Sequence, residues 1–481
     1  SVIGGTTAAA GSFTTLTASG AATAASYNGI TSKTFGTSSI MFGDNATGTI
    51  DAANYNVGVG VDVFAALTTG DGNIAVGFQA QDALTTGNYN VAIGYDALST
   101  NSTGSASVAI GKEALKVSTV SNNTAVGRVA LTANTTGGFN TAIGDGALKT
   151  NTTAANNTAV GHEALSANTT GAENVAVGAE ALEANTTGNE NVAVGYRALE
   201  GNTTGATNTA LGDRALASNT TASHNTAVGN NALVENTTGA QNTGVGANAG
   251  DAITTGSNNS AIGYEALGKL TTGTDNTGLG RAAGLDTTTG TGNTAIGVEA
   301  LENNTTSSEN TAVGKHAGRD ITGANNVVIG VNAGHDALTT ITTGSNNIVL
   351  GNNSTSVFET KVSLTVGSDE RDKTDIETLP DNAGLNFVNQ MRPVTYVWDN
   401  RTNYYSHEHE KYGERDHSKK SSDKQLGFIA QEIKVIENSI GWTDDHVVNT
   451  SNSLSYKLME TQLIPILVKA LQEADDKIDA L

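Results

Sequence analysis

The sequence predicts a mainly β protein, in which a β-solenoid (β-roll) of 17-residue repeats precedes a small α+β domain that ends in a helix. Three observations lead to this prediction. A tandem repeat with a period of 17 residues fills residues 56–351. The composition suits short strands and tight corners, with 57 Gly, 3 Pro and 5% aromatic residues in 481. Near residue 368 the repeat has stopped, and all three Pro and both Trp of the chain lie beyond that point.

The charge and the cysteine content exclude several classes of protein. The formal net charge at pH 7 is −22, which does not suit binding to the phosphate backbone of a nucleic acid. The chain contains no Cys, so a disulfide framework and thiolate chemistry are excluded. It also lacks a run of about 18 apolar residues, so we expect no insertion into a membrane.

Residues 1–55 consist mostly of Ala, Thr, Ser and Gly with scattered apolar residues. The phrase IGGTTAAAGSFTTLTASG resembles stretches that are common in the shafts of phage tail fibres. We therefore expect a fibre shaft or connector here. The alternative is a flexible low-complexity linker.

The repeat follows the template N-T-A-V-G-x-x-A-L-x-x-N-T-T-G-x-x. Its closing Gly recurs every 17 residues, with two steps of 16 and a last step of 21. These positions are Gly60, Gly77, Gly94, Gly111, Gly127, Gly144, Gly161, Gly178, Gly195, Gly212, Gly229, Gly246, Gly263, Gly280, Gly297, Gly314, Gly330 and Gly351. A short fixed period indicates a solenoid, in which each repeat stacks on its neighbours.

We expect each repeat to form one turn of a β-coil. Seventeen residues are too few for two packed helices, and the segments between corners are rich in Val, Ile and Thr. Both Gly of a repeat should adopt a positive φ at corners. The Val or Ile before the closing Gly, as in Val160 and Val177, and the pair Ala164-Leu165 should point inward. Because this core is thin for one chain, we expect a homotrimer of coils that share an axis.

The residue four before the closing Gly is Asn in nearly every repeat, with Ser107 as the visible exception. Stacked amides can bond along such an array, which predicts an Asn ladder. The alternative is a row of metal or glycan ligands, but the acidic residues do not line up as an oxygen cage. The NTT triplets match the glycosylation acceptor pattern. We interpret them as turns, because they recur with the repeat.

The array resembles the heads of trimeric autotransporter adhesins, in which AIG-type repeats build a left-handed β-roll in a trimer. This resemblance covers about 300 residues and implies, for this chain, a trimer and a handedness of the coil. Rows of Thr on a flat β-coil are also typical of ice-binding proteins. An ice- or glycan-binding β-solenoid is therefore an alternative.

The repeat gives way to a different region after Gly351. SVFETKVSLTVG (356–367) alternates like a final pair of strands, so residues 352–367 are predicted to be final strands and a linker. Beyond them lie GSDERDKTDI (367–376), MRPVTYVW (391–398) and GFIAQEI (427–433), followed by an amphipathic tail. These motifs resemble the intramolecular chaperone domain of phage tailspikes, tail fibres and endosialidases. We assign residues 368–481 to this domain.

The resemblance implies a domain that trimerises, drives folding of the β-fibre before it, and then cuts itself off with a Ser-Lys dyad. The matching positions are Ser368 as nucleophile and Lys373 as general base, with cleavage between Gly367 and Ser368. A serine hydroxyl needs a base to take its proton, and Lys can serve only if its pKa is lowered. The alternative is structural, with Ser368 or Asp369 capping a short helix and Lys373 facing solvent.

Two further segments of this domain have simpler interpretations. HEHEKYGERDHSKK (407–420) lacks the HExxH spacing of zinc sites, so we expect a charged loop or hairpin. The tail carries a heptad seam, which favours a short coiled coil. Its members are Ile464, Leu467, Leu471, Ala474, Ile478 and Leu481. The alternative is a single amphipathic helix packed on its own domain.

Together these features predict a structural tail-fibre protein of a phage virion, assembled in the host cytoplasm. Its expected partners are two further copies of the chain, other tail proteins at the N-terminus, and a host cell-surface receptor such as a glycan or outer-membrane component. We expect a single-turnover serine autoprotease with no cofactor and no metal. The alternative is a bacterial surface trimeric adhesin. A glycan depolymerase would need paired carboxylates and aromatic platforms, which the repeat does not offer.

Overall fold

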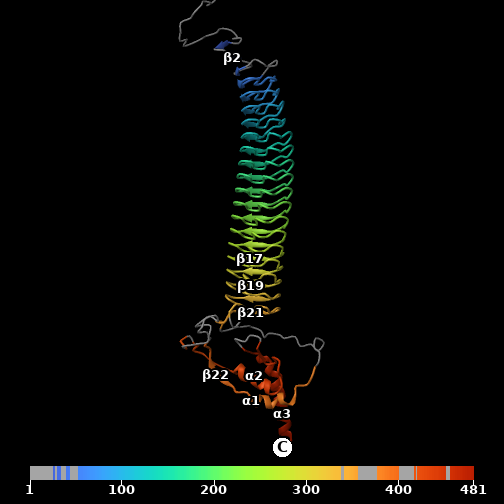
Figure 1. Ribbon diagram of the computed structural model, residues 1–481, viewed down its shortest axis with the longest axis vertical. Helices are drawn as coiled ribbons and strands as arrows, with labels where there is room; N and C mark the ends of the chain where they lie inside the picture. Colours follow the sequence, from blue (N-terminus) through green and yellow to red (C-terminus); the bar gives the residue numbers. More distant parts are fainter. Residues whose placement is uncertain are drawn as a thin grey trace, which may run out of the picture. The chain divides into compact units, whose positions relative to one another are not determined.

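A computed structural model describes residues 25–27, 30–33, 39–43, 53–336, 341–355, 376–399, 417–418, 420–450 and 456–480. Strands β3 to β21 are the 19 strands of a parallel β-solenoid, which confirms the predicted class (Figure 1). The chain divides into two compact units, Ser1–Ala295 with Thr305–Ser307 and Ile296–Asn304 with Ser308–Leu481. In the described ranges, no helix combines the length and the apolar character needed to cross a membrane.

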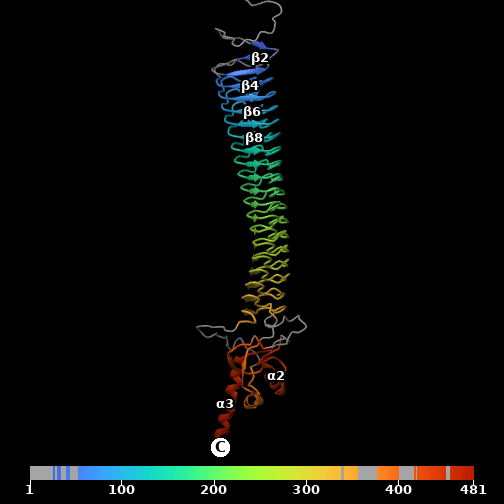
Figure 2. The ribbon, with the colours of Figure 1, turned by 90° about the vertical axis from the view of Figure 1, so that its left-hand side faces the viewer.

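Each turn of the solenoid contributes one short strand to a parallel sheet (Figure 2). The strands of the first unit are β3 (Ile40–Gly43), β4 (Val57–Gly60), β5 (Ile74–Val76), β6 (Val91–Ile93), β7 (Val108–Ile110), β8 (Thr124–Val126), β9 (Thr141–Ile143), β10 (Thr158–Val160), β11 (Val175–Val177), β12 (Val192–Val194), β13 (Thr209–Leu211), β14 (Thr226–Val228), β15 (Thr243–Val245), β16 (Ser260–Ile262) and β17 (Thr277–Leu279). After them come β18 (Thr294–Ile296), β19 (Thr311–Val313), β20 (Val327–Ile329) and β21 (Ile348–Leu350).

Two antiparallel strands precede the first parallel one. Strand β1 (Ala25–Tyr27) pairs with β2 (Ile30–Lys33), and β2 pairs with β3. Strand β3 then pairs in parallel with β4. Part of the N-terminal segment that was predicted as a shaft or connector therefore forms β structure next to the first turn.

The register of the sheet is fixed by the repeat itself. Thr158 of β10 lies opposite Val175 of β11, and Ala159 lies opposite Ala176. Backbone hydrogen bonds also join the other side of successive turns, for example from Leu165 N–H to the carbonyl of Ala181 (3.0 Å). Every turn is thus bonded to its neighbours on both sides of the coil, which satisfies the backbone groups that the narrow core would otherwise bury.

The prediction for the inward residue of the strand was wrong. The middle Ala of each Thr-Ala-Val strand, such as Ala159, is fully buried, whereas Val160 is only partly buried on the outer face. Successive side chains of a strand point to opposite faces, so Ala and Val cannot both face inward. The predicted inward pair Ala164-Leu165 is buried, as expected, and Leu165 fills the coil opposite the small Ala.

The prediction of positive φ holds for only one of the two Gly. Gly178, which closes its repeat, has a φ of 138°, and a Cβ there would lie 2.3 Å from the carbonyl oxygen of Gly195. Gly171, from the NTTG segment, is not in the left-handed region. A Cβ there would approach the carbonyl oxygen of Gly188 to 2.4 Å. The second Gly therefore serves the close approach of neighbouring turns, and Ala154 and Ala222 take its place in two repeats.

The predicted Asn ladder is confirmed. Asn157 is buried, and its Oδ1 accepts hydrogen bonds from the backbone N–H (2.9 Å) and Nδ2 (3.2 Å) of Asn174 in the next turn. Asn174 Nδ2 also donates to the carbonyl of Gly188 (2.9 Å). Ser107 interrupts the ladder but still bonds to the turn before, because its backbone N–H donates to Asn90 Oδ1 (3.0 Å).

A second Asn ladder runs through the NTT triplets, which were interpreted only as turns. Asn168 is buried, and its Nδ2 donates to Asn151 Oδ1 in the turn before and to the carbonyl of Gly171 (both 2.9 Å). The next rung is Asn185, whose Nδ2 donates to Asn168 Oδ1 (2.9 Å). The acceptor-pattern Asn of these triplets thus face the core rather than solvent.

The C-terminal region, residues 376–480, is a small α+β fold. Its elements are a 3-10 turn η2 (Asp381–Ala383), α1 (Leu385–Gln390), β22 (Val394–Val397), β23 (Lys424–Gly427), α2 (Ala430–Ser439), β24 (Val448–Asn449), β25 (Lys457–Leu458), a second 3-10 turn η4 (Glu460–Gln462) and α3 (Leu463–Asp479). Strands β22 and β23 form one antiparallel pair and β24 and β25 another.

Candidate functional site

The predicted cleavage site lies outside the described residues. Gly367, Ser368 and Lys373 all fall within residues 356–375, so the Ser-Lys dyad stays a prediction. The described chain resumes at Ile376 and leads into the C-terminal region. The structure therefore describes side chains of the fold that comes after the predicted dyad in the sequence.

A small apolar core holds the helices of this region together. Phe387 of α1 is fully buried and packs with Ile433 and Ile436 of α2 and Leu463 and Ile466 of α3. Val447 and Val448, at the start of β24, complete the core. Three helices from separate parts of the sequence thus share one apolar centre, which fixes the region as a single packed fold.

Two of the motifs quoted from the sequence meet in space. MRPVTYVW supplies β22, and GFIAQEI supplies the end of β23 and the start of α2. Val394 lies opposite Gly427 in the antiparallel register. Beside this pair, Arg392 Nε donates to Glu432 Oε2 (3.1 Å), and the hydrogen bond from Arg392 lowers the pKa of Glu432. This ion pair is exposed, so it contributes little to stability.

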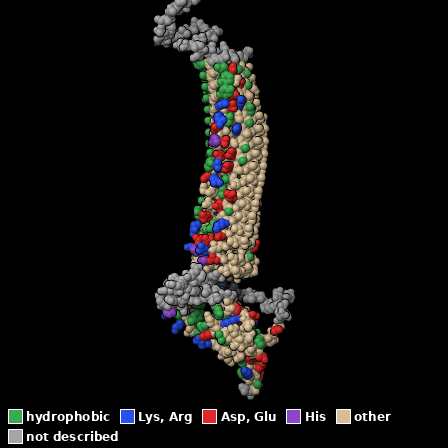
Figure 3. All heavy atoms as spheres, in the orientation of Figure 1, with side chains coloured by type: hydrophobic (Ala, Val, Ile, Leu, Met, Phe, Trp, Pro, Cys, Tyr) green, Lys and Arg blue, Asp and Glu red, His purple; other side chains and the backbone are tan. Residues whose placement is uncertain are grey.

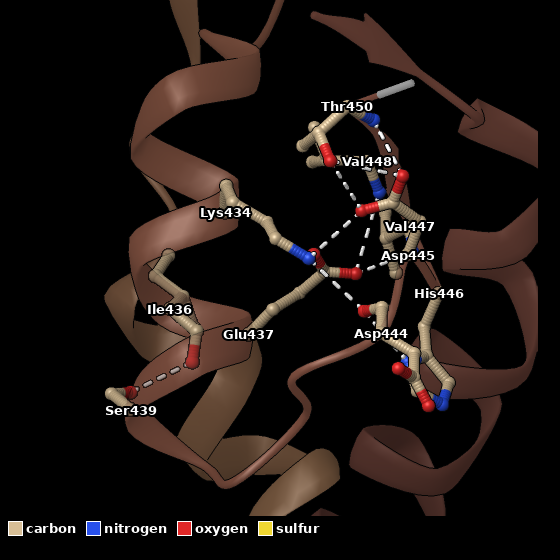
Figure 4. Close-up of polar contacts among 10 residues, drawn as sticks. All are labelled: Lys434, Ile436, Glu437, Ser439, Asp444, Asp445, His446, Val447, Val448 and Thr450. Carbon is tan, nitrogen blue, oxygen red and sulfur yellow. Dashed lines mark hydrogen bonds and ion pairs between the residues drawn. The ribbon is translucent and has the colours of Figure 1, made fainter.

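Glu437 is a fully buried carboxylate on the inner face of α2 (Figure 4). Its Oε1 accepts hydrogen bonds from the backbone N–H groups of Val447 and Val448. Its Oε2 lies 3.2 Å from Lys434 Nζ, one helical turn earlier. Because a buried charge is costly unless it is paired and hydrogen-bonded, these partners fasten the segment before β24 to α2.

Lys434 extends this network to a second carboxylate. Its Nζ donates to Asp445 Oδ1 (3.1 Å) and to the carbonyl of Asp444 (3.0 Å). Asp445 Oδ2 also accepts from the backbone N–H of Thr450 (2.6 Å). Burial alone would lower the pKa of Lys434, but its hydrogen bonds to Asp445 and Glu437 raise it overall. The hydrogen bond from the Thr450 N–H lowers the pKa of Asp445, and the weaker influence of Lys434 lowers it further.

A third carboxylate joins α3 to α1. Glu473 Oε2 accepts a hydrogen bond from the backbone N–H of Leu385 (2.8 Å), the first residue of α1. Lys469 Nζ lies 3.3 Å from the other oxygen of Glu473. The Leu385 N–H, with Lys469 as a weaker influence, lowers the pKa of Glu473. The two ends of the region's sequence, α1 and α3, are therefore joined by polar as well as apolar contacts.

Part of the C-terminal region matches a known protein family. Residues 368–441 match the family described as chaperone of endosialidase. The match begins at Ser368, and α1, β22, β23 and α2 lie within it. No curated protein and no solved structure matches the chain. The chain thus carries, after a β-solenoid, a segment that is similar to the chaperone of endosialidase; we call residues 368–441 the chaperone segment.

Helix α3 follows the endosialidase-chaperone segment and has two apolar faces. Leu463, Ile466 and Ala470 are buried in the core. Ile464, Leu467, Leu471 and Ile478, which belong to the predicted heptad seam, are exposed. The buried and the exposed apolar residues therefore lie on adjacent faces of one helix. The helix packs on its own domain, and the coiled coil stays a prediction.

A groove lies beside the exposed seam. It is lined by Thr378 and Leu379 and by five residues of α3, namely Ile464, Pro465, Val468, Lys469 and Gln472.

The histidine-rich segment is described only in part. His407 and His409 lie outside the described residues, whereas His417 Nδ1 lies 2.6 Å from Asp399 Oδ2 at an exposed position. Within the array, the carboxylates of Glu180, Glu183 and Glu200 approach within 4.8 Å of one another. Arg197 Nε pairs with Glu180 (2.6 Å). The sequence analysis did not identify this cluster, because the three residues come from two repeat positions.

Sequence reasoning also missed the carboxylates of the chaperone segment and of α3. Glu437 could have been found, because it follows the apolar Ile433 by four residues, which places both on the same face of α2. Glu473 could not, because its partner Leu385 N–H lies 88 residues away in the sequence.

Proposed function

We propose that the chain is a tail-fibre protein of a phage virion whose C-terminal domain drives its folding and trimerisation and then cleaves itself off. The observation that carries this proposal is the order of the parts. A β-solenoid comes first, and a segment that matches the chaperone of endosialidase begins at Ser368, the residue predicted as the nucleophile. A long parallel array needs such help, because a slip by one turn costs little energy and non-local pairing is slow.

The proposed cleavage needs only the two residues of the dyad. Lys373 in its neutral form takes the proton of the Ser368 hydroxyl, and Oγ attacks the carbonyl carbon of Gly367. The Lys373 ammonium then gives this proton to the peptide nitrogen of Ser368, the C–N bond breaks, and the nitrogen leaves as an amine, which gives an ester between Gly367 and Ser368. Water then hydrolyses the ester, and this frees the carboxylate of Gly367 and restores the hydroxyl. One turnover per chain suffices.

Trimerisation is supported by helix α3. Its exposed seam residues Ile464, Leu467, Leu471 and Ile478 are spaced in the 3-4 pattern of a coiled coil. Large apolar side chains aligned on one face of a surface helix favour burial against another helix. Two further copies of the chain are the partners that we propose, and the three α3 helices would bring the arrays into register.

The fibre's target in this proposal is a receptor on the host cell surface, a glycan or an outer-membrane component. Other tail proteins would bind its N-terminal part, and assembly would take place in the host cytoplasm. The ice-binding alternative receives less support from the described turns. The first Thr of the NTT triplets uses its hydroxyl internally, as in Thr169 Oγ1, which donates to the carbonyl of Thr186 (2.9 Å).

The decisive experiment compares the purified full chain with Ser368→Ala by intact mass and denaturing gel. We expect the wild type to give fragments 1–367 and 368–481, and we expect both Ser368→Ala and Lys373→Gln to stay whole. Ser363→Ala is the matched control, because it removes a nearby hydroxyl outside the dyad and should be cleaved like the wild type. An intact wild type would overturn autocleavage, and sedimentation of the same samples tests the trimer separately.

A further inference from the structure

The C-terminal fold begins with a segment that lies along α3. We call residues 376–385, where the described chain resumes after the predicted dyad, the lead-in. Near its start, Thr378 and Leu379 line the groove that Ile464 lines from the first turn of α3. Near its end, it contacts Glu473 in the third turn of the same helix. The lead-in therefore follows α3 from its first turn to its third.

Glu473 fixes the end of the lead-in to α3. Its Oε2 accepts the hydrogen bond from the backbone N–H of Leu385 (2.8 Å), and Lys469 Nζ lies 3.3 Å from its other oxygen. The same Nζ lies 3.6 Å from a carboxylate oxygen of Asp381, within the lead-in. A hydrogen bond to a carboxylate is stronger than one between neutral groups, and the side chain of Glu473 is only 24% exposed. The contact is therefore better protected from water than an ordinary surface pair.

Gly384 shows how closely the lead-in lies against Glu473. A Cβ at Gly384 would lie 2.3 Å from Glu473 Oε1 and 2.6 Å from Oε2. Both oxygens belong to the end of a flexible side chain. A methyl group at this position would therefore displace the carboxylate from the Leu385 N–H rather than displace a backbone, so the glycine keeps the contact in place.

A second helix holds the other side of the lead-in. Asn382 Nδ2 donates to the carbonyl of Ile440 (3.1 Å), the residue that follows α2. Ile440 belongs to the chaperone segment, whereas Glu473 does not. The position of the lead-in is thus set by two helices, and one of them lies outside the part of the chain that matches the known family.

We infer that Glu473 is a positioning residue for the proposed self-cleavage. By fixing the lead-in on α3, it fixes the point from which the chain leads back to Lys373 and Ser368. Thr378 follows Lys373 by five residues, so the Cα atoms of these two residues can be at most about 18 Å apart. The inference rests on the proposed function, and it names a residue that acts on the dyad without touching the reacting atoms.

The placement matters because the dyad is exacting in its geometry. Lys373 can take the proton of Ser368 only at hydrogen-bonding distance, roughly 3 Å between Nζ and Oγ. A displacement of about 1 Å by a change far from the reacting atoms can cost roughly 100-fold in rate. A lead-in without Glu473 keeps its sequence and its apolar contacts, but it loses the contact that fixes its end.

The test measures the rate of cleavage in the full chain. Newly made protein from cell-free synthesis is sampled over time, and the loss of the intact band on a denaturing gel gives the rate. We expect Glu473→Ala to be cleaved at least about tenfold more slowly than the wild type. Exposed carboxylates are common on the face of the molecule drawn in Figure 3. The matched control is therefore Asp475→Ala, which removes an exposed carboxylate from the same helix and should be cleaved at the rate of the wild type.

A second variant changes the same contact from the side of the lead-in. Gly384→Ala keeps the carboxylate but pushes it from the Leu385 N–H, so it should also slow cleavage. The effects of two changes that act through one contact are not additive. The double variant Gly384→Ala/Glu473→Ala should therefore be cleaved no more slowly than the slower of the two single variants. Losses that multiply would show that the two residues act separately, and they would overturn the inference.

Tryptophan fluorescence of the same samples separates positioning from loss of the fold, because Trp442 packs against Phe387 in the core (ring centroids 5.9 Å apart). Slow cleavage in variants that remain folded supports the inference. Cleavage of folded Glu473→Ala at the rate of the wild type overturns it and leaves autocleavage standing. If Glu473→Ala does not fold, folded Gly384→Ala decides by the same criterion. A wild type that stays whole overturns the proposed autocleavage, and the inference with it.

Discussion

Glu437, Lys434 and Asp445 form a chain of charges that fastens a loop to a helix. Glu437 is inside the core, where its two oxygens meet two backbone N–H groups and an ammonium. Asp445 lies at the surface end, where it holds Thr450 through both the backbone N–H and the hydroxyl. Removing one member of such a chain leaves its partners charged and less well satisfied, so the effect of a substitution should depend on pH.

Asp445→Asn tests this dependence. The pKa of Asp445 is lowered in the folded state, so its stabilisation is present above the ordinary value of about 3.9 and is lost as the pH falls through the folded-state value. We expect Asp445→Asn to lower the melting temperature of the C-terminal region at pH 7, and the difference from the wild type to shrink toward pH 3. Tryptophan fluorescence reports this region alone, because both Trp follow residue 368.

The control for this prediction is Asp444→Asn. Asp444 contacts Lys434 through its backbone carbonyl, which the substitution keeps. Its melting temperature should stay close to that of the wild type at both pH values. Equal losses in the two variants, or a loss in Asp445→Asn that does not change with pH, would contradict the role assigned to the Asp445 carboxylate.

At the level of residues, the sequence predicted one of the two recurring Asn ladders and missed the contacts that do not recur. The Asn157 ladder was predictable, because an amide at one position of every turn must stack on its copies. The NTT ladder through Asn168 was not recognised, because Asn followed by Thr is also a common turn sequence. The carboxylate contacts of Glu473 depend on chain folding across 88 residues, and no local pattern encodes them.

A turn of the solenoid depends on two Gly for different physical reasons. Gly178 combines a φ of 138° with close contact to the next turn, whereas Gly171 has the contact without the left-handed backbone. The repeat that contains Ala154 shows that the turns adjust to a methyl group at the second position. The first position has no such precedent among the 18 closing Gly of the sequence.

We therefore expect Gly178→Ala to destabilise the array more than Gly171→Ala does. A non-glycine residue in an incompatible backbone conformation costs more than about 1 kcal/mol, and Gly178→Ala adds a clash with the backbone of Gly195. Thermal unfolding followed by far-ultraviolet circular dichroism measures the difference. If Gly171→Ala were the more damaging of the two, inter-turn contact and not φ would be the dominant constraint on these corners.

For the elements, the sequence correctly predicted the length of each turn but not which side chains of the strand face inward. Seventeen residues per turn and a strand before the closing Gly followed from the repeat. Which residues of Thr-Ala-Val face inward did not, because a strand of three residues allows either assignment. The structure places Ala159 inside and Val160 outside, since the interior of so narrow a coil has room for a methyl group opposite Leu165.

For the whole molecule, the proposed cleavage means that the ability to refold and the lifetime of the folded fibre have different origins. Under this proposal, an uncleaved chain would keep its chaperone segment and could fold again after denaturation. A cleaved fibre would have lost that segment, and its persistence would then depend on the rate of unfolding rather than on equilibrium. We thus expect denatured Ser368→Ala to regain the circular dichroism and trimeric state of the native protein on dilution, and the cleaved wild type not to regain them.

The control for refolding is to add the separately expressed segment 368–481 to the denatured, cleaved fibre. An intramolecular chaperone should not rescue folding in trans, because the covalent link supplies the effective concentration. Full refolding of cleaved fibre without any addition would contradict the chaperone's role. The sequence supported this whole-molecule proposal through its motifs alone, since Ser368 and Lys373 lie outside the described residues.

The hydrogen bonds between turns also determine how the array would respond to force. They run along the stacking direction, from one turn to the next, so tension applied along that direction loads the turns in series. Rupture would then proceed one turn at a time from an end, as in unzipping, and each freed repeat would lengthen the chain by roughly 50 Å. Such an array would yield in steps and absorb work, where a rigid rod would break.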